Sequence, residues 1–342
     1  MRMGRFAVSG VVACIFAVCA AGYGQSLSSG LPTPTTSGVA KPAGAVGGLK
    51  VLDWAGYKSA ITYTFDDSIQ SQIDNYPKLQ ATGAKMTFFL VGSSDQSASA
   101  WAQAAKDGHE LGNHTEHHCH ANGTGCGWGA YAGSLEAEYD LCTAHIEQTY
   151  GVSNVWTTAT PYGDMGYDAT AKTRFFLNRG VWGGQIMPND NTDPYNLLVH
   201  GVVAGESVAS FNSVIDAGDR AGSWQIFLFH SLGGDGGYAP VKVDDVLESI
   251  HHAQSLHDVW IDTMVNVGAY WAGQKAVTNA TKSVAGGETV LQWTLPDHFP
   301  PGKFVRVTLT GGTLKQGGKA LAWNPAGYYE VALDAGSVAI SK

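Results

Sequence analysis

Two adjacent carboxylates, Asp66 and Asp67, close an apolar stretch and could support hydrolytic chemistry. The stretch AITYTFDD (residues 60–67) is rich in β-branched and aromatic residues, which predicts a β-strand. Because successive side chains of a strand point to opposite sides, the two acids can have different tasks. One can bind a metal ion while the other acts as a general base. The same pair also suits a helix N-cap followed by a first-turn acid at the start of residues 68–79.

Five histidines lie within thirteen residues, in the segment GHELGNHTEHHCH (residues 108–120). His114 and His118 are four residues apart, a spacing that on one helical turn presents both imidazoles to a single divalent ion such as zinc. With an aspartate from the strand end, they complete a set of two histidines and one carboxylate. An incidental pairing is the alternative. The remaining histidines cannot all share that face, so we expect surface or supporting positions for His109, His117 and His120.

The composition describes a globular, acidic protein. The chain has 342 residues, 44% of them apolar and 14% charged, enough to bury at least one large core. Its formal charge is -9 and it has no basic run, which argues against a nucleic-acid partner. Residues 1–24 combine two arginines, an apolar run and small residues, as a secretory signal peptide does. The run is shorter than the ~20 residues of a membrane span. We therefore expect a secreted or periplasmic protein without a stable membrane anchor.

Three cysteines lie beyond the predicted signal peptide: Cys119, Cys126 and Cys142. In an oxidising compartment this odd number implies one pair and one free thiol. A disulfide between Cys119 and Cys126 would close the small glycine-containing loop CHANGTGC. A zinc–thiolate site is the alternative, although the spacing matches no zinc-finger pattern.

Composition divides the rest of the chain into three parts. Residues 25–48 are rich in Ser, Thr, Pro and Gly, which is typical of a flexible linker. Residues 49–273 alternate predicted strands and helices, whereas residues 274–342 alternate strands and turns without a helical stretch. The last part is therefore expected to be a small all-β domain. Its aromatic residues can form a core or stack on sugars, and we favour the core for Trp293, Trp323, Tyr328 and Tyr329.

In the larger domain, helical patterns separate the strand patterns. Helices are predicted over residues 71–83, 97–108, 134–151, 168–180, 207–222 and 240–258. This alternation implies βαβ units and a parallel sheet, and so many units suggest a barrel. Functional residues of such sheets gather at the carboxyl ends of the strands. Asp66, Asp67, Pro161, Tyr162 and His230 all fall where a predicted strand ends.

Over residues 61–270 these segments resemble the polysaccharide deacetylases, the carbohydrate esterase family 4 or NodB-homology group. TFDD resembles the first family motif, which implies that Asp66 is the catalytic base and Asp67 a metal ligand. HTEHH resembles the second motif, H-[ST]-x-x-H, and implies that His114 and His118 are the other metal ligands. The resemblance implies one bound divalent metal ion, with zinc expected and cobalt, nickel or iron as alternatives.

Two further motifs follow in the family's order. TPYG resembles the third, in which the tyrosine after Pro161, Tyr162, helps to hold an oxyanion through its backbone N–H. LFH resembles the fifth, L-x-H, and implies that His230 is the general acid. Any one of these motifs is a weak signal, but four in order are specific. The fold implied is an α/β distorted (β/α) barrel of the polysaccharide deacetylase type, followed by the small all-β domain.

The sequence departs from the family pattern at two places. Many members carry an arginine two residues before the proline of the third motif, where this chain has Ala159. Arg174 or Arg179 could take its place, and the sequence does not choose between them. The fourth motif, an acid with a tryptophan, is not recognisable either. Its candidates are Trp182, Asp190 and Asp193.

The resemblance implies a secreted, metal-dependent hydrolase that removes acetyl groups from an N-acetylated glycan, such as a chitooligosaccharide or peptidoglycan. An O-acetyl esterase acting on xylan is one alternative, because the same metal and base would serve it with less demand on His230. A non-catalytic glycan-binding module on the same scaffold is another. The two acids, two histidine ligands and His230 argue against that module, whereas the missing arginine at position 159 favours it.

Overall fold

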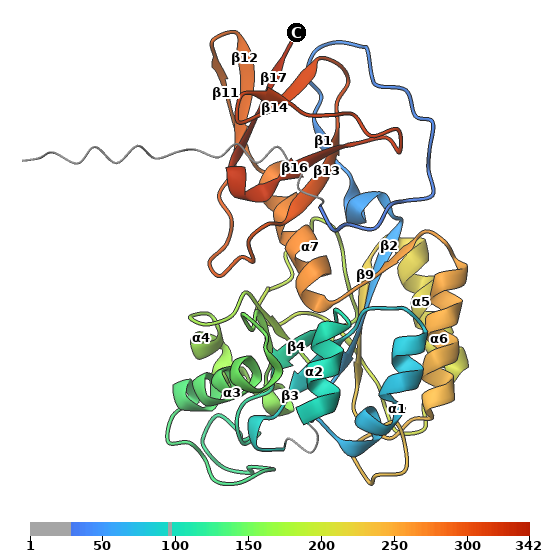
Figure 1. The fold of residues 1–342 in the computed structure, drawn as a ribbon, viewed down its shortest axis with the longest axis vertical. Coiled ribbons are helices and arrows are strands. Elements are labelled where there is room, and N and C mark those ends of the chain that lie inside the picture. The colour runs from blue at the N-terminus through green and yellow to red at the C-terminus, as the bar shows by residue number, and fades with distance from the viewer. Residues whose placement is uncertain (1–28, 95–97) are drawn as a thin grey trace, which may run out of the picture.

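The computed structural model describes residues 29–94 and 98–342. An α/β domain occupies the lower part of Figure 1, and a smaller β-domain lies above it. The main sheet has the order β6-β5-β4-β3-β2-β9-β7, with β10 also paired to β2 and β8 to β9. Its strands are β2 (Ser59–Phe65), β3 (Thr87–Leu90), β4 (Glu110–Asn113), β5 (Thr157–Ala159), β6 (Leu177–Arg179), β7 (Gln185–Ile186), β8 (His200–Gly201), β9 (Trp224–Phe229) and β10 (Val259–Ile261).

The sheet is parallel except for β7, which runs antiparallel to β9 at one edge. The pairing follows a curled path from β6 to β7 and does not close on itself, which confirms the predicted distorted barrel. Every residue of β2 and β9 is buried. Strands covered on both faces need apolar side chains in both directions, and this is why their sequences are continuous apolar runs.

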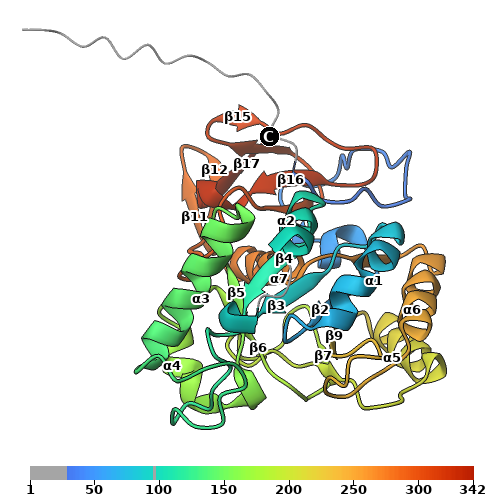
Figure 2. The ribbon, with the colours of Figure 1, turned by 60° about the horizontal axis from the view of Figure 1, so that its bottom comes forward.

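Helices cover the outside of the sheet, and Figure 2 shows α1, α3, α5 and α6 around it. The helices are α1 (Gln70–Ala81), α2 (Ala98–Lys106), α3 (Leu135–Tyr150), α4 (Asp168–Ala171), α5 (Val208–Ala221), α6 (Val243–Ser255) and α7 (Met264–Thr278). Local signals set their ends. The Ser134 side chain accepts a hydrogen bond from the Ala137 N–H at the start of α3, and Gly151 ends it in the left-handed conformation.

One predicted helix is wrong over most of its length. Residues 168–180 were expected to be helical, but only α4 is helical there and the chain then enters strand β6. The apolar residues Phe175, Phe176 and Leu177 are buried as the chain joins the sheet. A short apolar run fits a buried strand as well as a helix, so periodicity alone could not decide.

The β-domain contains two sheets. The five-stranded antiparallel sheet has the order β11-β12-β17-β14-β15, and the three-stranded sheet has the order β1-β13-β16. Their strands are β1 (Lys50–Val51), β11 (Thr281–Ala285), β12 (Glu288–Gln292), β13 (Phe304–Thr308), β14 (Thr313–Gln316), β15 (Lys319–Ala320), β16 (Tyr329–Ala332) and β17 (Ser337–Ser341). Trp293, Tyr328 and Tyr329 are buried, and Trp323 is half-buried with its indole N–H donating to the Val39 carbonyl. These aromatic residues therefore pack within the domain.

The segment expected to be a flexible linker is instead packed against this β-domain where the structure describes it, from residue 29 on. The guanidinium of Arg306 donates to the carbonyls of Pro32 at 2.7 Å and Leu31 at 3.3 Å. Further along, the Val39 N–H donates to the Pro325 carbonyl at 2.8 Å. Strand β1 follows at residues 50–51 and pairs with β13. Composition reflects local backbone freedom, and it did not reveal these partners near the other end of the chain.

The two domains share one hydrophobic core. Trp271 of α7 belongs to the same buried cluster as Val305 and Leu333 of the β-domain. A Cβ added to Gly273 would lie 2.4 Å from the Leu333 side chain, so only glycine allows this close approach. The predicted boundary between residues 273 and 274 therefore falls inside α7.

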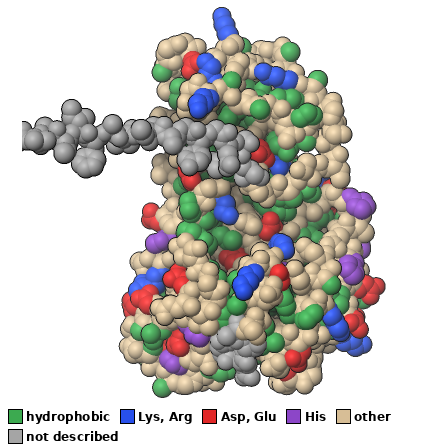
Figure 3. Space-filling view, in the orientation of Figure 1, with side chains coloured by type: hydrophobic (Ala, Val, Ile, Leu, Met, Phe, Trp, Pro, Cys, Tyr) green, Lys and Arg blue, Asp and Glu red, His purple; other side chains and the backbone are tan. Residues whose placement is uncertain are grey.

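Two further observations concern sequence predictions. Among residues 29–94 and 98–342, no helix combines the length and the apolar run that a bilayer crossing requires. The predicted signal peptide, residues 1–24, lies outside the described residues and stays a prediction. On the face drawn in Figure 3, Lys and Arg side chains of the described residues are interspersed with acidic ones instead of forming one basic area.

Candidate active site

The two adjacent acids lie where β2 ends. The Asp66 N–H donates to the Phe229 carbonyl of β9 at 3.0 Å, which places the ends of β2 and β9 side by side. Asp67 then turns the chain with φ of 79°, a left-handed conformation. Both side chains are buried, at 3% and 8% exposure. They are therefore not a helix cap on the surface, because their carboxylates point into the protein.

The two histidines lie on a loop after β4, and the expected helical turn is absent. His114 follows β4 directly, its N–H donating to the Leu90 carbonyl at 2.9 Å. Thr115 and His118 both have left-handed φ, of 65° and 52°. The Asn113 side chain accepts the Thr115 N–H at 2.8 Å, and the Thr115 hydroxyl accepts the His118 N–H at 3.0 Å. These local bonds fold the loop so that both imidazoles still converge.

Asp67, His114 and His118 form a compact set of three ligand atoms. Asp67 Oδ1 lies 3.4 Å from His114 Nε2 and 3.5 Å from His118 Nε2. Donors bound at about 2.1 Å around a tetrahedral ion lie about 3.4 Å from one another. Within the described residues, buried Asp67 Oδ1 has no hydrogen-bond partner. The His114 Nδ1–H donates to the Ala159 carbonyl at 2.6 Å, which leaves Nε2 free to bind. The set fits one divalent metal ion.

The electrostatics of this set favour bound cations. Burial would raise the pKa of Asp67, but the close approach and charge of His114, with the charges of His230 and His118, lower that pKa to about 2. Burial opposes protonation of His114, yet the charges of Asp66 and Asp67 outweigh it and raise the His114 pKa. Burial and the neighbouring His114 lower the pKa of His118 to about 4. A metal ion would take the place of the proton that the carboxylates attract.

Arg179 is the partner of Asp66. Its Nη2 donates to Asp66 Oδ2 in a buried ion pair, and its Nη1 donates to the Gly180 carbonyl at 2.9 Å. The guanidinium also lies over the Phe89 ring, 5.2 Å from its centroid. Arg179 stands on β6, directly beside Ala159 of β5 in the strand register. The arginine missing at position 159 is therefore replaced from the neighbouring strand.

Three other candidates for the missing motifs, Arg174, Asp190 and Asp193, lie outside the pocket, whereas Trp182 lines it. Arg174 binds Asp140 in an exposed ion pair. The Asp190 carboxylate accepts the N–H groups of Met187 and Thr192, and Asp193 accepts that of Tyr195. These acids order their own loop and do not line the pocket that holds Asp66 and Asp67.

His230 also lines the pocket and directly follows β9, the strand beside β2. Burial lowers its pKa, and the charges of Asp66 and Asp67 offset this only in part. Its Nδ1 is buried without a hydrogen-bond partner among the described residues. The Tyr238 ring meets the His230 ring edge-on, with centroids 4.8 Å apart. No carboxylate therefore holds Nδ1 in the described part of the chain.

One pocket of about 390 Å³ contains these groups. Val181, Val202 and Leu228 form an apolar part of its lining. Trp182 and Tyr238, at its rim, are 61% and 70% exposed. Sequence reasoning missed Val202 and Tyr238. The only signal for Tyr238 was an aromatic residue in the glycine-rich loop that follows His230.

The third-motif residues form another wall of this pocket. Pro161 is buried and begins a short 3-10 turn, in which Tyr162 has a left-handed φ of 58°. The Tyr162 side chain is 49% exposed and lines the pocket.

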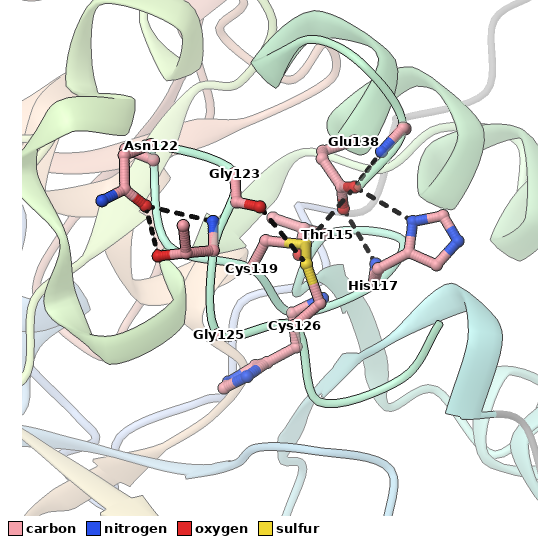
Figure 4. The surroundings of a disulfide bond; sticks show 12 residues. Thr115, His117, Cys119, Asn122, Gly123, Gly125, Cys126 and Glu138 are labelled. Atoms are coloured by element: carbon pink, nitrogen blue, oxygen red, sulfur yellow. Dashed lines mark hydrogen bonds and ion pairs between the residues drawn. A yellow bond between two sulfur atoms is a disulfide. The ribbon is translucent and has the colours of Figure 1, made fainter. Parts of the chain in front are cut away.

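A disulfide joins Cys119 and Cys126 directly after the loop that carries His114 and His118 (Figure 4). The third cysteine, Cys142, is buried and unpaired. Burial raises the pKa of its thiol well above the ordinary range. The three cysteines therefore form one disulfide and leave one free thiol, as expected. The described residues contain no zinc–thiolate cluster.

Comparisons with known proteins show what the sequence resembles. Residues 55–176 match the polysaccharide deacetylase family model. A gellan lyase from a Bacillus species is 27% identical over 212 residues, which are 56% of this chain and 8% of that protein. The chain therefore spans a small part of this relative's length.

Solved structures with low similarity include two carbohydrate-active proteins. The Xyl-CE4 domain of a multidomain xylanase from the Trinervitermes trinervoides hindgut metagenome is 18% identical, with a TM-score of 0.42 over 61% of this chain and 88% of that one. A family 4 acetyl xylan esterase from Clostridium thermocellum is 17% identical, with a TM-score of 0.43 over 61% and 89%. The family match covers β2 to β5, including both acids and both histidines of the site. Residues 55–176 of the α/β domain are therefore similar in sequence to the polysaccharide deacetylase family.

Proposed function

We propose that the α/β domain is a metal-dependent hydrolase that removes acetyl groups from an N-acetylated glycan. The observation that carries this proposal is the convergence of three features in one pocket: the Asp67–His114–His118 set, the Arg179-bound Asp66 and His230. When bound, a divalent ion lowers the pKa of a coordinated water and polarises a carbonyl group. The remaining chemistry belongs to the chain's own side chains.

Asp66 is the proposed general base. Its Oδ2 is held by Arg179, whereas its buried Oδ1 has no hydrogen-bond partner among the described residues. One oxygen is therefore fixed and the other is available to accept a proton from the attacking water. The Arg179 guanidinium also compensates the buried carboxylate charge, because a buried ion without a partner is costly.

His230 is the proposed general acid. Departure of an amine requires a proton, since an unprotonated amine is a very poor leaving group. His230 and Asp66 line the same pocket at the ends of neighbouring strands, and the His230 imidazole can deliver that proton to the glycan nitrogen. The Tyr162 backbone N–H is the proposed donor to the developing oxyanion, because preorganised donors stabilise charge where it develops.

The lining of the pocket supports an acetylated sugar as the substrate. Val181, Val202 and Leu228 provide an apolar surface for the acetyl methyl group. Trp182 and Tyr238 are exposed at the rim, where aromatic rings can stack on the apolar faces of sugar rings. An adjoining pocket of about 260 Å³ shares Asp67 and includes Trp128, which offers room for a neighbouring sugar unit.

One observation favours an O-acetyl esterase as the second candidate. The Nδ1 of His230 has no carboxylate partner among the described residues, so nothing there stabilises the imidazolium through that atom. An ester depends less on the acid because an alkoxide leaves more easily than an amide anion. His230→Gln separates the two functions: for an amide substrate it should lower kcat by about 100-fold or more. For an acetyl ester the loss should be much smaller.

An acetate-release screen tests the proposed function. The purified protein is incubated with chitooligosaccharides, peptidoglycan and acetylxylan, each with and without a chelator. We expect release from an N-acetylated substrate that the chelator abolishes and added zinc or cobalt restores. Release from acetylxylan alone would favour the esterase, and no release from any substrate would contradict both candidates.

We further propose that the protein acts outside the cytoplasm. The Cys119–Cys126 disulfide supports this, because disulfides persist in oxidising compartments. The predicted signal peptide points the same way. Fractionation of the producing cells tests it: the protein should be found in the periplasm or the medium, and retention in the cytoplasm would contradict export.

A further inference from the structure

A disulfide closes the loop of residues 119–126 (Figure 4), which directly follows the pocket residue His118 and takes no part in the chemistry proposed above. Both of its ends are tied to His118. Cys119 follows His118 in the chain, and the N–H of Gly127, the residue after Cys126, donates to the His118 carbonyl at 3.2 Å. The disulfide thus closes a ring of residues that begins and ends next to His118, one of the candidate metal ligands.

The same loop holds the side chain of Tyr162. The Tyr162 hydroxyl donates to the Gly125 carbonyl at 2.6 Å. The His120 ring stacks on the Tyr162 ring, with centroids 4.0 Å apart and an interplanar angle of 17°. The Tyr162 ring also meets the His118 ring, with centroids 4.6 Å apart. The half-exposed Tyr162 side chain therefore contacts both the loop and a candidate metal ligand.

The backbone conformation of Tyr162 explains why its contacts with the loop matter. Its φ of 58° lies in the left-handed region, which is unfavourable for an aromatic residue. A conformation of this kind persists only when the surroundings determine it. The contacts with Gly125 and His120 are such surroundings, and they fix the residue whose N–H is proposed to face the oxyanion.

The loop is itself anchored on two sides. On one side, the Tyr167 hydroxyl donates to the Cys119 carbonyl at 3.1 Å, and the Ala121 N–H donates to Asp164 at 2.9 Å. On the other side stands Glu138 of α3, which is fully buried. Its carboxylate accepts the backbone N–H of His117 at 2.8 Å and the Nδ1–H of the same residue at 3.0 Å. Hydrogen bonds therefore hold the loop at Cys119 and Ala121, and hold His117 just before it.

We propose that the loop 119–126 is a positioning element, which holds Tyr162 in its left-handed conformation and, through the Tyr162 ring, fixes the orientation of His118. The disulfide contributes by keeping Gly125 and His120 in place against the tyrosine. The kinetic consequence rests on the proposed hydrolase function, whereas the consequence for metal binding does not.

Three variants test this role: Tyr162→Phe, which keeps the ring and removes the hydroxyl, the double variant Cys119→Ser/Cys126→Ser, and their combination. The dissociation constant for Co²⁺ is measured by competition with a chromophoric chelator. Acetate release gives kcat and KM. Groups that orient metal ligands typically change metal affinity by about tenfold or more. We expect each variant to weaken Co²⁺ binding by about tenfold, with a fall in kcat and little change in KM.

The combination decides whether the disulfide acts through Tyr162. Both changes loosen the same contact. The Co²⁺ affinity of the combined variant should therefore be close to that of whichever of the two separate variants binds Co²⁺ more weakly. Tyr195→Phe is the matched control, since its hydroxyl donates to the Phe175 carbonyl at 3.2 Å away from the loop. It should leave Co²⁺ affinity and kcat unchanged.

The outcomes separate this role from the proposed function. Weakened Co²⁺ binding in Tyr162→Phe, together with no acetate release from the wild type on any substrate, would support the positioning role and contradict the hydrolase. An active wild type with unchanged Co²⁺ affinity and kcat in folded Tyr162→Phe would overturn the positioning role. Independent, multiplying effects of the two changes would overturn it as well.

Discussion

Arg179 and Ala159 stand side by side in register on the parallel strands β6 and β5, and the Arg179 guanidinium reaches Asp66 from there. The family pattern expects an arginine at position 159. In this chain the same charge arrives from the next strand, at the same level of the sheet. On the sequence alone, the missing arginine at position 159 favoured a non-catalytic module. Arg179 supplies the guanidinium instead, so that argument no longer holds.

The first prediction concerns this exchange. Arg179→Met should lower kcat/KM for acetate release by about 100-fold or more, because it leaves the proposed base without its partner. In an Arg179→Ala background, adding Ala159→Arg should recover part of the loss, since it returns the guanidinium through the neighbouring position. Arg174→Met is the control and should be silent, because Arg174 binds exposed Asp140. Full activity of Arg179→Met would contradict this account of Asp66.

The second prediction concerns the rim of the pocket. Trp182 is 61% exposed and lines the pocket, so its indole can contact a sugar unit without touching the acetyl group. Trp182→Ala should raise KM for an oligosaccharide about fivefold, the equivalent of about 1 kcal/mol of aromatic contact. Its kcat/KM for a small acetyl ester should stay near that of the wild type. Val284→Ala, on the exposed strand β11, is the control. Equal losses on both substrates would contradict a stacking role.

The third prediction concerns stability and pH. Buried His109 accepts the Met86 N–H at Nδ1, at 3.1 Å, and its Nε2–H donates to Gln80 at 2.6 Å. Burial, with the charge of Lys85, lowers the His109 pKa to about 4. The unfolded chain, with an ordinary histidine pKa of about 6.5, binds this proton more readily. The stabilisation is therefore fully present above pH 6.5 and is lost as the pH falls toward 4, by about 1–2 kcal/mol at pH 5.

Chemical denaturation at pH 7 and pH 5 measures this effect. His109→Gln should lose less stability between the two pH values than the wild type does. His251→Gln, which replaces an exposed histidine of α6, should behave as the wild type. If His109→Gln and the wild type lose equal stability on acidification, the neutral hydrogen-bonded form of His109 is not the cause.

The fourth prediction concerns the segment that precedes the α/β domain. Arg306 is 1% exposed and donates to the carbonyls of Leu31 and Pro32. A chain that begins at residue 35 should unfold at a lower temperature than one that begins at residue 29, because buried donors lose their acceptors at a cost of about 1–3 kcal/mol. In an Arg306→Met background the same truncation should cost less. Equal melting temperatures of the two chains would show that the segment does not stabilise the protein.

The sequence was most informative where function depends on short, ordered motifs. Asp66 and Asp67 could be placed at a strand end because β2 is a continuous apolar run. The convergence of His114 and His118 was also predictable, although the reason given was wrong. A helical turn was expected, whereas two left-handed residues, Thr115 and His118, bend the loop instead. Such backbone conformations are uncommon outside glycine and leave little trace in composition.

Long-range pairing could not be predicted from the sequence. Arg179 was expected on a helix over residues 168–180, so its register beside Ala159 was hidden. The segment from residue 29 was expected to be flexible, because Ser, Pro and Gly content describes a chain without its partner. Its partner, Arg306, lies more than 250 residues away in the sequence. Such contacts depend on tertiary packing, which overrides local preference.

The measurement that tests the central claim most directly compares the wild type with Asp66→Asn for both bound metal and acetate release. If Asp66 is the base and Asp67, His114 and His118 hold the ion, both proteins should bind about one divalent metal ion per chain. Only the wild type should release acetate from an N-acetylated oligosaccharide. An Asp66→Asn variant that is as active as the wild type, or a wild type whose activity persists after complete removal of metal, would contradict the account.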